Sequence, residues 1–108
     1  MSSPGSAPRV RIFSVSRSIE VQIPEAVEPY AEDIRRFVDA MVYKLALKAD
    51  KGRWEDLPIA KAHDLMLDET AELESAIHGG NLIEILLEAA DVANFALIIA
   101  SIAIERGK

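Results

Sequence analysis

The sequence predicts an all-α domain, built from an antiparallel helical hairpin and one helix that precedes it. Three observations support this fold class. Apolar residues recur every three or four positions in three long segments, which is the spacing of one helix face. Gly and Pro stand at the ends of these segments and not inside them. The last two segments are separated only by Gly79 and Gly80, and so short a link favours antiparallel neighbours.

A tail covering residues 1–28 is expected to precede the helical domain, which spans residues 29–108. Residues 1–8 are mostly Ser, Pro, Gly and Ala, a composition typical of disorder. Residues 9–23 alternate in part, as in SIEVQI, and this pattern favours a short strand.

The first helix is predicted from about Pro29 to Asp50. Proline suits the first helical position, and Gly52 follows as a stop signal. Acidic residues at the start and lysines near the end match the helix dipole. The apolar stripe of this helix consists of Ile34, Phe37, Val38, Met41 and Leu45.

The two hairpin helices follow. One is predicted from Pro58 to His78, with Gly79 as its C-terminal cap. The other is predicted from Asn81 to about Glu105, and Asn81 with Glu84 resembles a capping box.

Composition limits the possible partners and compartments. The net charge of −6 argues against a nucleic acid or an anionic membrane as partner. The chain has no cysteine, which excludes a disulfide framework and a cysteine zinc site and suits a reducing cytosol. The first residues lack the apolar core of a secretory signal. A cytoplasmic protein is therefore expected.

Residues 82–104 are long and apolar enough to span a bilayer. They nevertheless contain Glu84, Glu88, Asp91 and Asn94. A carboxylate near the bilayer centre costs on the order of 3 kcal/mol. A buried helix in a soluble oligomer, with no membrane partner, is therefore the preferred interpretation.

Carboxylates interrupt the apolar face of both hairpin helices. On the first of them, Glu69 lies at the centre of the stripe and Glu72 about 60° to one side. On the second, Glu88 lies on the apolar face and Asp91 at its margin. The surrounding apolar residues are Ala62, Leu65, Met66, Leu73, Ala76 and Ile77 on one helix, and Ile85, Val92, Phe95 and Ile99 on the other.

Folding the hairpin about Gly80 brings these acids together. Glu72 and Glu88 are each eight residues from Gly80, whereas Glu69 and Asp91 are each eleven residues away. Carboxylates that share a partly buried cleft repel one another unless protons or cations neutralise them. Hard cations prefer oxygen ligands, and Mg²⁺ often binds substrate phosphates as well. The sequence therefore predicts four ligands for Mg²⁺, with Mn²⁺ as a possible substitute. The alternative is that these acids pair with lysines at an oligomer interface.

The same residues resemble a known family. The segments DETAEL (Glu69-x-x-Glu72) and EAADVAN (Glu88-x-x-Asp91) are similar to the paired motif of the MazG-like, all-α nucleoside triphosphate pyrophosphohydrolases. The segment KLALKADKGRW, residues 44–54, resembles the Lys-Leu…Lys-Gly-x-Trp segment of their small members, some of which have Asn in place of Lys48. The resemblance covers about residues 30–105.

This resemblance implies an enzyme. Its substrate would be a (deoxy)nucleoside triphosphate, cleaved to the monophosphate and pyrophosphate, often to clear unwanted nucleotides from the pool. In such families Mg²⁺ bridges carboxylates and phosphates, and the helical unit forms dimers or tetramers. Glu69 is a candidate general base toward the attacking water.

Five further residues are candidates for substrate binding, and each has a structural alternative. Lys44, Lys48 and Lys51 could meet phosphate oxygens, or the first two could satisfy the end of a helix. Trp54 could stack on a base, or anchor its loop on the core. Asn94 could touch metal or substrate, or bond to a neighbouring helix.

Two other functions stay open. One is a phosphoribosyl-ATP pyrophosphohydrolase-like enzyme, whose fold and acidic motifs are related. The other is a non-catalytic helical assembly module, because the last helix is apolar nearly all round. In either case the sequence predicts a homo-oligomer, a dimer or tetramer, in which partners cover the apolar residues Leu87, Leu97, Ile98 and Ile104.

Overall fold

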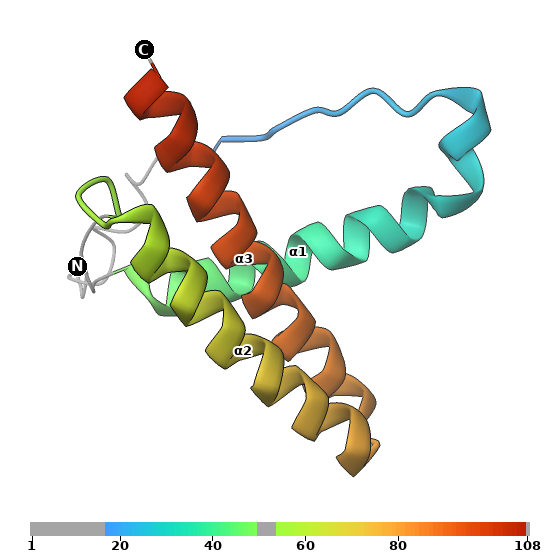
Figure 1. Ribbon diagram of the computed structural model, residues 1–108. Coiled ribbons are helices and arrows are strands. Elements are labelled where there is room, and N and C mark those ends of the chain that lie inside the picture. The colour runs from blue at the N-terminus through green and yellow to red at the C-terminus, as the bar shows by residue number, and fades with distance from the viewer. Residues whose placement is uncertain (1–16, 50–53, 108) are drawn as a thin grey trace, which may run out of the picture.

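A computed structural model describes residues 17–49 and 54–107 as a helical domain. It contains a 3₁₀ helix, η2 (Glu25–Tyr30), and three α-helices, α1 (Ala31–Leu47), α2 (Ile59–Gly79) and α3 (Leu82–Gly107). These residues include no strand. The predicted all-α class is thus confirmed. Helices α2 and α3 lie side by side as an antiparallel hairpin, and α1 crosses α3 (Figure 1).

The start of the first helix differs from the prediction. Pro29 lies inside η2, and α1 begins two residues later, at Ala31. The tighter coil begins where the amide of Val27 donates to the carbonyl of Pro24, 2.8 Å away. Helix α1 ends at Leu47, and the amide of Lys48 then donates to the carbonyl of Leu45, 3.0 Å away. The helix therefore ends three residues before the predicted Asp50, while Asp50 itself and the stop signal Gly52 lie outside the described residues.

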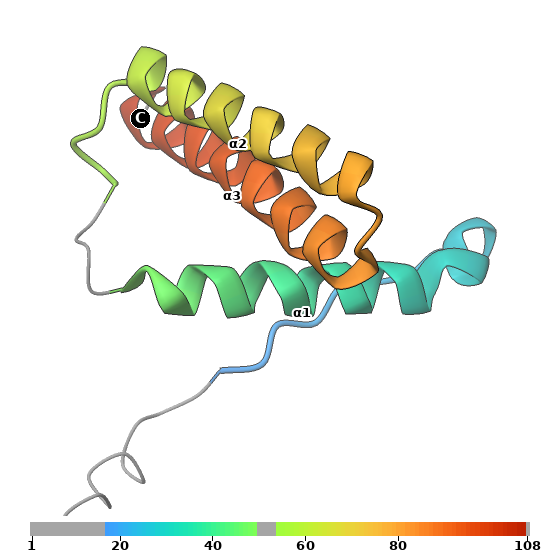
Figure 2. The ribbon, with the colours of Figure 1, turned by 90° about the horizontal axis from the view of Figure 1, so that it is seen from below.

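The strand predicted within residues 9–23 is absent from residues 17–23, and its first part, residues 9–16, lies outside the described residues. Residues 17–23 follow an extended path that approaches the beginning of α1 (Figure 2). There Ile19, Val21 and Ile23 share a shallow cavity with Ile34 and Val38. Ile19 is 86% exposed and Val21 is 69% exposed, so the alternation in this segment corresponds to neither a strand nor a buried face within the described residues.

The hairpin turn uses Gly80 and Asn81. Gly80, not Gly79, adopts the left-handed conformation (φ 76°), and its amide donates to the carbonyl of Ala76, 3.0 Å away. A residue without a Cβ is favoured at such a position. The Asn81 side chain accepts a 3.1 Å hydrogen bond from the amide of Glu84, which caps α3 as its sequence predicts. Only two residues therefore separate the helices.

The core lies between the hairpin helices. Ala62 of α2 is buried against Ile98 and Ile102 of α3. Alanines are also buried at position 76 of α2, position 90 of α3 and position 40 of α1. Such small side chains let helix axes approach closely. Because α3 packs against both α2 and α1, it is the central helix of the domain (Figure 2).

Several apolar side chains remain exposed. On α1 they include Ile34, Val38 and Val42, which recur every four residues along one face. On α3, Leu97 and Ile104 are exposed, Leu87 is half-buried, and Ile98 is buried inside the chain. The expectation that Ile98 needs a partner is therefore wrong, because the hairpin itself covers it. The homo-oligomer stays a prediction.

Helix α3 is also apolar over a length that could cross a bilayer. In the described part of the chain this holds for one segment, Leu82–Arg106. The core helix of a soluble protein passes the same test, so the observation is weak evidence for a membrane span.

Candidate metal centre

Three carboxylates meet between α2 and α3. Glu69, Glu88 and Asp91 each offer an oxygen, and these oxygens all lie within 4.8 Å of one another. Asp91 is only 4% exposed, whereas Glu69 and Glu88 are half-buried. We call these residues the carboxylate cluster. It forms because Glu69 interrupts the buried face of α2 and the short turn fixes its level on α3.

Glu72, the fourth predicted ligand, lies outside the carboxylate cluster. It is exposed on α2. Its position about 60° from the centre of the stripe turns it toward solvent. Because α1 packs on α3 and not on α2, no described helix covers that side.

Two lysines at the C-terminal end of α1, Lys44 within the helix and Lys48 directly after it, reach the carboxylate cluster. The Nζ atom of Lys44 lies 3.0 Å from Oδ2 of Asp91, and that of Lys48 lies 3.3 Å from Oδ1. We call Lys44 and Lys48 the lysine pair. They are four residues apart in the sequence, and they occupy both oxygens of a single buried carboxylate. The alternative expectation of lysine pairing is thus realised for Asp91, within one chain.

The charges of the carboxylate cluster and the lysine pair do not balance, and they shift the pKa of two of these residues. Burial lowers the pKa of Lys44, but its hydrogen bond to Asp91 and the nearby acids outweigh burial and raise it above 10.5. Burial, followed by the charge of Asp91, raises the pKa of Glu69 above 4.5, although Lys48 opposes this change. Neither Glu69 nor Glu88 forms an ion pair within residues 17–49 and 54–107. Three carboxylates facing two ammonium groups leave one negative charge in excess.

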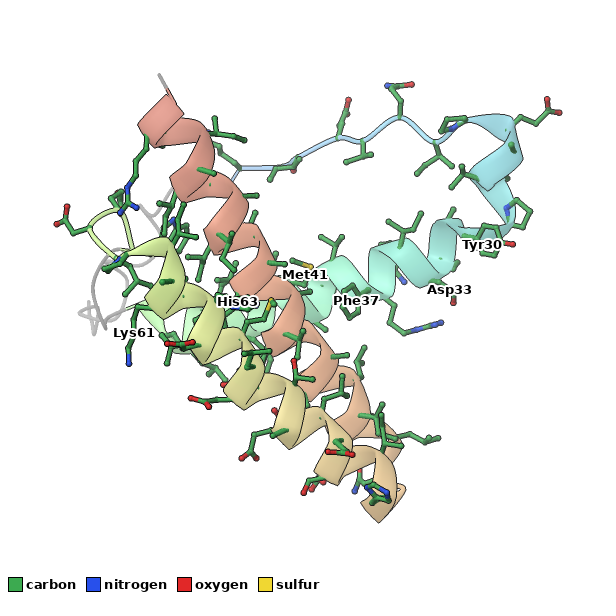
Figure 3. All side chains as sticks on the ribbon, viewed as in Figure 1. Tyr30, Asp33, Phe37, Met41, Lys61 and His63 are labelled. Carbon is green, nitrogen blue, oxygen red and sulfur yellow. The ribbon has the colours of Figure 1, made fainter. Side chains whose placement is uncertain are left out.

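Asn94, one helical turn beyond Asp91, joins α3 to α1. Its amide nitrogen donates a 3.0 Å hydrogen bond to the carbonyl of Met41. Met41 lies where α1 passes α3 (Figure 3). The helix-bonding alternative for Asn94 is therefore observed. Its Oδ1 atom is buried and has no hydrogen-bond partner among the described residues.

The donor set fits a hard divalent cation. Carboxylate oxygens from three residues converge, and two of those residues have no ion pair among the described residues. Mg²⁺ and Mn²⁺ favour such oxygen ligands. His63 and His78 are not part of the carboxylate cluster, so the nitrogen ligands typical of zinc are lacking there.

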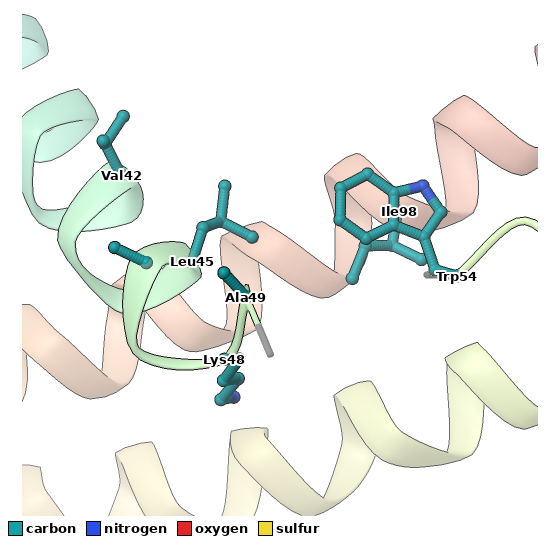
Figure 4. Close-up of a pocket in the computed structure, with 7 residues that line it drawn as sticks. Val42, Leu45, Lys48, Ala49, Trp54 and Ile98 are labelled. Carbon is teal, nitrogen blue, oxygen red and sulfur yellow. The ribbon is translucent and has the colours of Figure 1, made fainter. Parts of the chain in front are cut away.

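A cavity opens beside Lys48. It has a volume of about 450 Å³, and its lining is apolar apart from Lys48 (Figure 4). Trp54 lines it together with Val42, Leu45, Ala46, Ala49 and Ile98. We call it the tryptophan cavity. Trp54 also packs on the core formed by Ala62, Ile98 and Ile102, so it anchors its loop and also faces open space. Lys51, the remaining predicted binding residue, lies outside the described residues.

Sequence reasoning missed two contacts of this site. Lys48 lies over the ring of Phe95, 5.5 Å from its centroid, which supports a cation–π contact. The carbonyl of Met41 is the acceptor that holds Asn94. The sequence pattern places Phe95 only in an apolar stripe, and a backbone acceptor cannot be recognised from a sequence.

Comparisons of the chain with known protein families, with curated proteins and with solved structures give no match. The family resemblance therefore stays a prediction, and any functional conclusion depends on the geometry of the site.

Proposed function

We propose that the protein is a Mg²⁺-dependent nucleoside triphosphate pyrophosphohydrolase. It would cleave a (deoxy)nucleoside triphosphate to the monophosphate and pyrophosphate, with Mn²⁺ as a possible substitute for Mg²⁺. The observation that carries the proposal is the carboxylate cluster, whose three oxygens lie within 4.8 Å of one another between two helices. Metal-assisted phosphoryl transfer requires such a set of oxygen ligands beside cationic groups.

The residues of the site would have different roles in the reaction. Glu69, Glu88 and Asp91 would hold the cation, which supplies charge neutralisation at the phosphates when bound. Glu69 is also the candidate base, because it is half-buried beside the other two carboxylates and forms no ion pair among the described residues. It would accept the proton of the attacking water while the bond between the α- and β-phosphates breaks and pyrophosphate leaves.

The tryptophan cavity suits the nucleoside part of this substrate. Its volume of about 450 Å³ lies within the usual range for small-molecule sites. The indole of Trp54 offers a face on which a base could stack. Lys48 lines the cavity and also reaches Asp91, so the phosphate chain would run from the cavity past Lys48 to the carboxylate cluster.

A nucleotide panel tests this proposal. The purified protein is incubated with Mg²⁺ and canonical, modified and phosphoribosyl nucleotides, and both products are identified. Pyrophosphate should form, and Glu88→Gln should abolish it. Glu72→Gln is the matched control, because it removes the same charge from an exposed glutamate outside the carboxylate cluster. Absence of pyrophosphate with every nucleotide, together with a melting temperature insensitive to Mg²⁺, would refute the proposal. Cleavage of phosphoribosyl-ATP alone would favour the related enzyme.

A second function is favoured by a different observation. The lysine pair already neutralises most of the charge on Asp91 without a metal, as it would in a non-catalytic assembly module. The exposed apolar residues of α1 and α3 would then serve only to join copies of the chain. We propose a cytoplasmic homo-oligomer under both functions, so activity and Mg²⁺ binding separate them, whereas oligomeric mass does not.

A further inference from the structure

Both oxygens of Asp91 are already occupied. Lys44 takes Oδ2 at 3.0 Å and Lys48 takes Oδ1 at 3.3 Å. Asp91 is 4% exposed, so it has no open side from which another cation could approach freely. Any cation that binds Asp91 together with Glu69 and Glu88 must therefore compete with the lysine pair for the oxygens of Asp91.

Charge makes joint occupancy unfavourable. Magnesium binds carboxylate oxygens at about 2.1 Å. An ammonium group that kept its present contact with the same carboxylate would then lie within a few ångströms of a divalent cation. In a site with low exposure that repulsion is weakly screened. The lysine side chains, which have long flexible stems, are the parts free to move.

We propose that the lysine pair is an internal counter-cation that the divalent metal displaces. Metal binding at Asp91 releases Lys44 and Lys48, and the freed ammonium groups then bind the phosphate oxygens that arrive with the metal. This inference depends on the metal site of the proposed function. It makes the metal–triphosphate complex, and not the free triphosphate, the substrate of the site, because without metal the lysines are engaged.

The exchange does not require α1 to leave the hairpin. Helix α1 is also held by the hydrogen bond from Asn94 to the carbonyl of Met41, which involves no charged group. The Lys48 side chain is 41% exposed and borders the tryptophan cavity, so it has space to swing toward a ligand there. Lys44 is more enclosed, with a side chain 18% exposed, and is the more sensitive reporter of release.

Amine labelling of the intact protein tests the exchange. The parent chain is acetylated briefly with and without Mg²⁺, in the absence of nucleotide, and each lysine is quantified by mass spectrometry. Lys44 labelling should rise roughly threefold to tenfold with Mg²⁺, the range expected when charge-assisted contacts are lost. Lys61 is the internal control, because it is exposed on α2 and points away from α3 (Figure 3). Asp91→Asn should give the released level of Lys44 labelling without Mg²⁺.

The labelling experiment is repeated with pyrophosphate. With Mg²⁺ in excess, pyrophosphate should again protect Lys44 and Lys48 but not Lys61, and without Mg²⁺ it should change none of them. If Mg²⁺ raises the melting temperature while Lys44 labelling stays constant, the metal binds without exchange and this inference is overturned alone. If Mg²⁺ changes neither the melting temperature nor the labelling, the metal site itself is refuted, and the inference falls with it.

Discussion

Asp91→Asn and Glu69→Gln should change the metal-free stability in opposite directions. Each substitution keeps the shape of the side chain and removes one negative charge from the carboxylate cluster. Asp91 has two cationic partners, whereas Glu69 has no ion pair among the described residues. Removing the charge of Asp91 therefore leaves the lysine pair without its acceptor, and removing that of Glu69 relieves repulsion.

The magnitude for Asp91→Asn follows from burial. Breaking a fully buried ion pair costs about 3–5 kcal/mol, and an exposed pair contributes about 0.2–1 kcal/mol. The Lys44 contact joins side chains 18% and 5% exposed, and the Lys48 contact joins side chains 41% and 5% exposed. Both lie between these limits, so we expect Asp91→Asn to lower the free energy of unfolding by about 2–3 kcal/mol. Glu69→Gln should raise it by up to about 1 kcal/mol.

Thermal melts without metal measure both effects. For a domain of this size, 1 kcal/mol moves the melting temperature by about 4–8 °C, so Asp91→Asn should lower it by about 10–20 °C. Glu69→Gln should raise it by a few degrees, and Glu72→Gln should leave it nearly unchanged. Mg²⁺ should stabilise the parent and no longer stabilise either cluster variant. A higher metal-free melting temperature for Asp91→Asn would contradict the reasoning, because it would mean that the lysine pair does not neutralise Asp91.

Three further outcomes are expected. The folded-state pKa of Glu69 is raised above 4.5, so its contribution to stability is complete below that pH and is lost as the pH rises through the raised value. As the pH is raised from 4.5 to neutrality without metal, the melting temperature of the parent should therefore decrease relative to that of Glu69→Gln. Trp54→Ala should raise KM by the loss of a stacking contact of about 1–3 kcal/mol, whereas Leu57→Ala, in the same core but outside the tryptophan cavity, should lower the melting temperature with KM unchanged. Val38→Asp, at a position 47% exposed on the apolar face of α1, should reduce the oligomeric mass measured by light scattering; an unchanged mass would exclude that face from the interface.

The hairpin was predictable because its determinants are local. Helix periodicity identified the buried face of α2, and the glycines at its end indicated how closely α3 follows. Together they placed Glu69 near Asp91 before any tertiary contact was known. The start of α1 was less predictable, because Pro29 is equally compatible with the first turn of an α-helix and with the 3₁₀ helix that contains it.

Sequence reasoning could not show that Lys44 and Lys48 pair with Asp91 within one chain, or that Glu72 lies outside the carboxylate cluster, for one shared physical reason. Both depend on the side of the hairpin on which α1 docks, and that packing joins positions 48 and 91, which are 43 residues apart. A helical wheel shows Glu72 and Asp91 alike at the margins of their stripes. Because α1 covers α3 and not α2, Asp91 becomes buried and paired while Glu72 faces solvent.

The two-residue turn at Gly80 and Asn81 makes the site intolerant of length variation between α2 and α3. One inserted residue advances α3 by about 1.5 Å and rotates it by about 100° unless the connection absorbs it. The turn cannot absorb an extra residue, because Gly80 is already in the left-handed conformation and Asn81 already caps α3. Such an insertion would leave both helices intact yet carry Glu88 away from Glu69. Insertions and deletions in relatives or engineered versions should therefore be excluded from this turn, even where the helices themselves accept many substitutions.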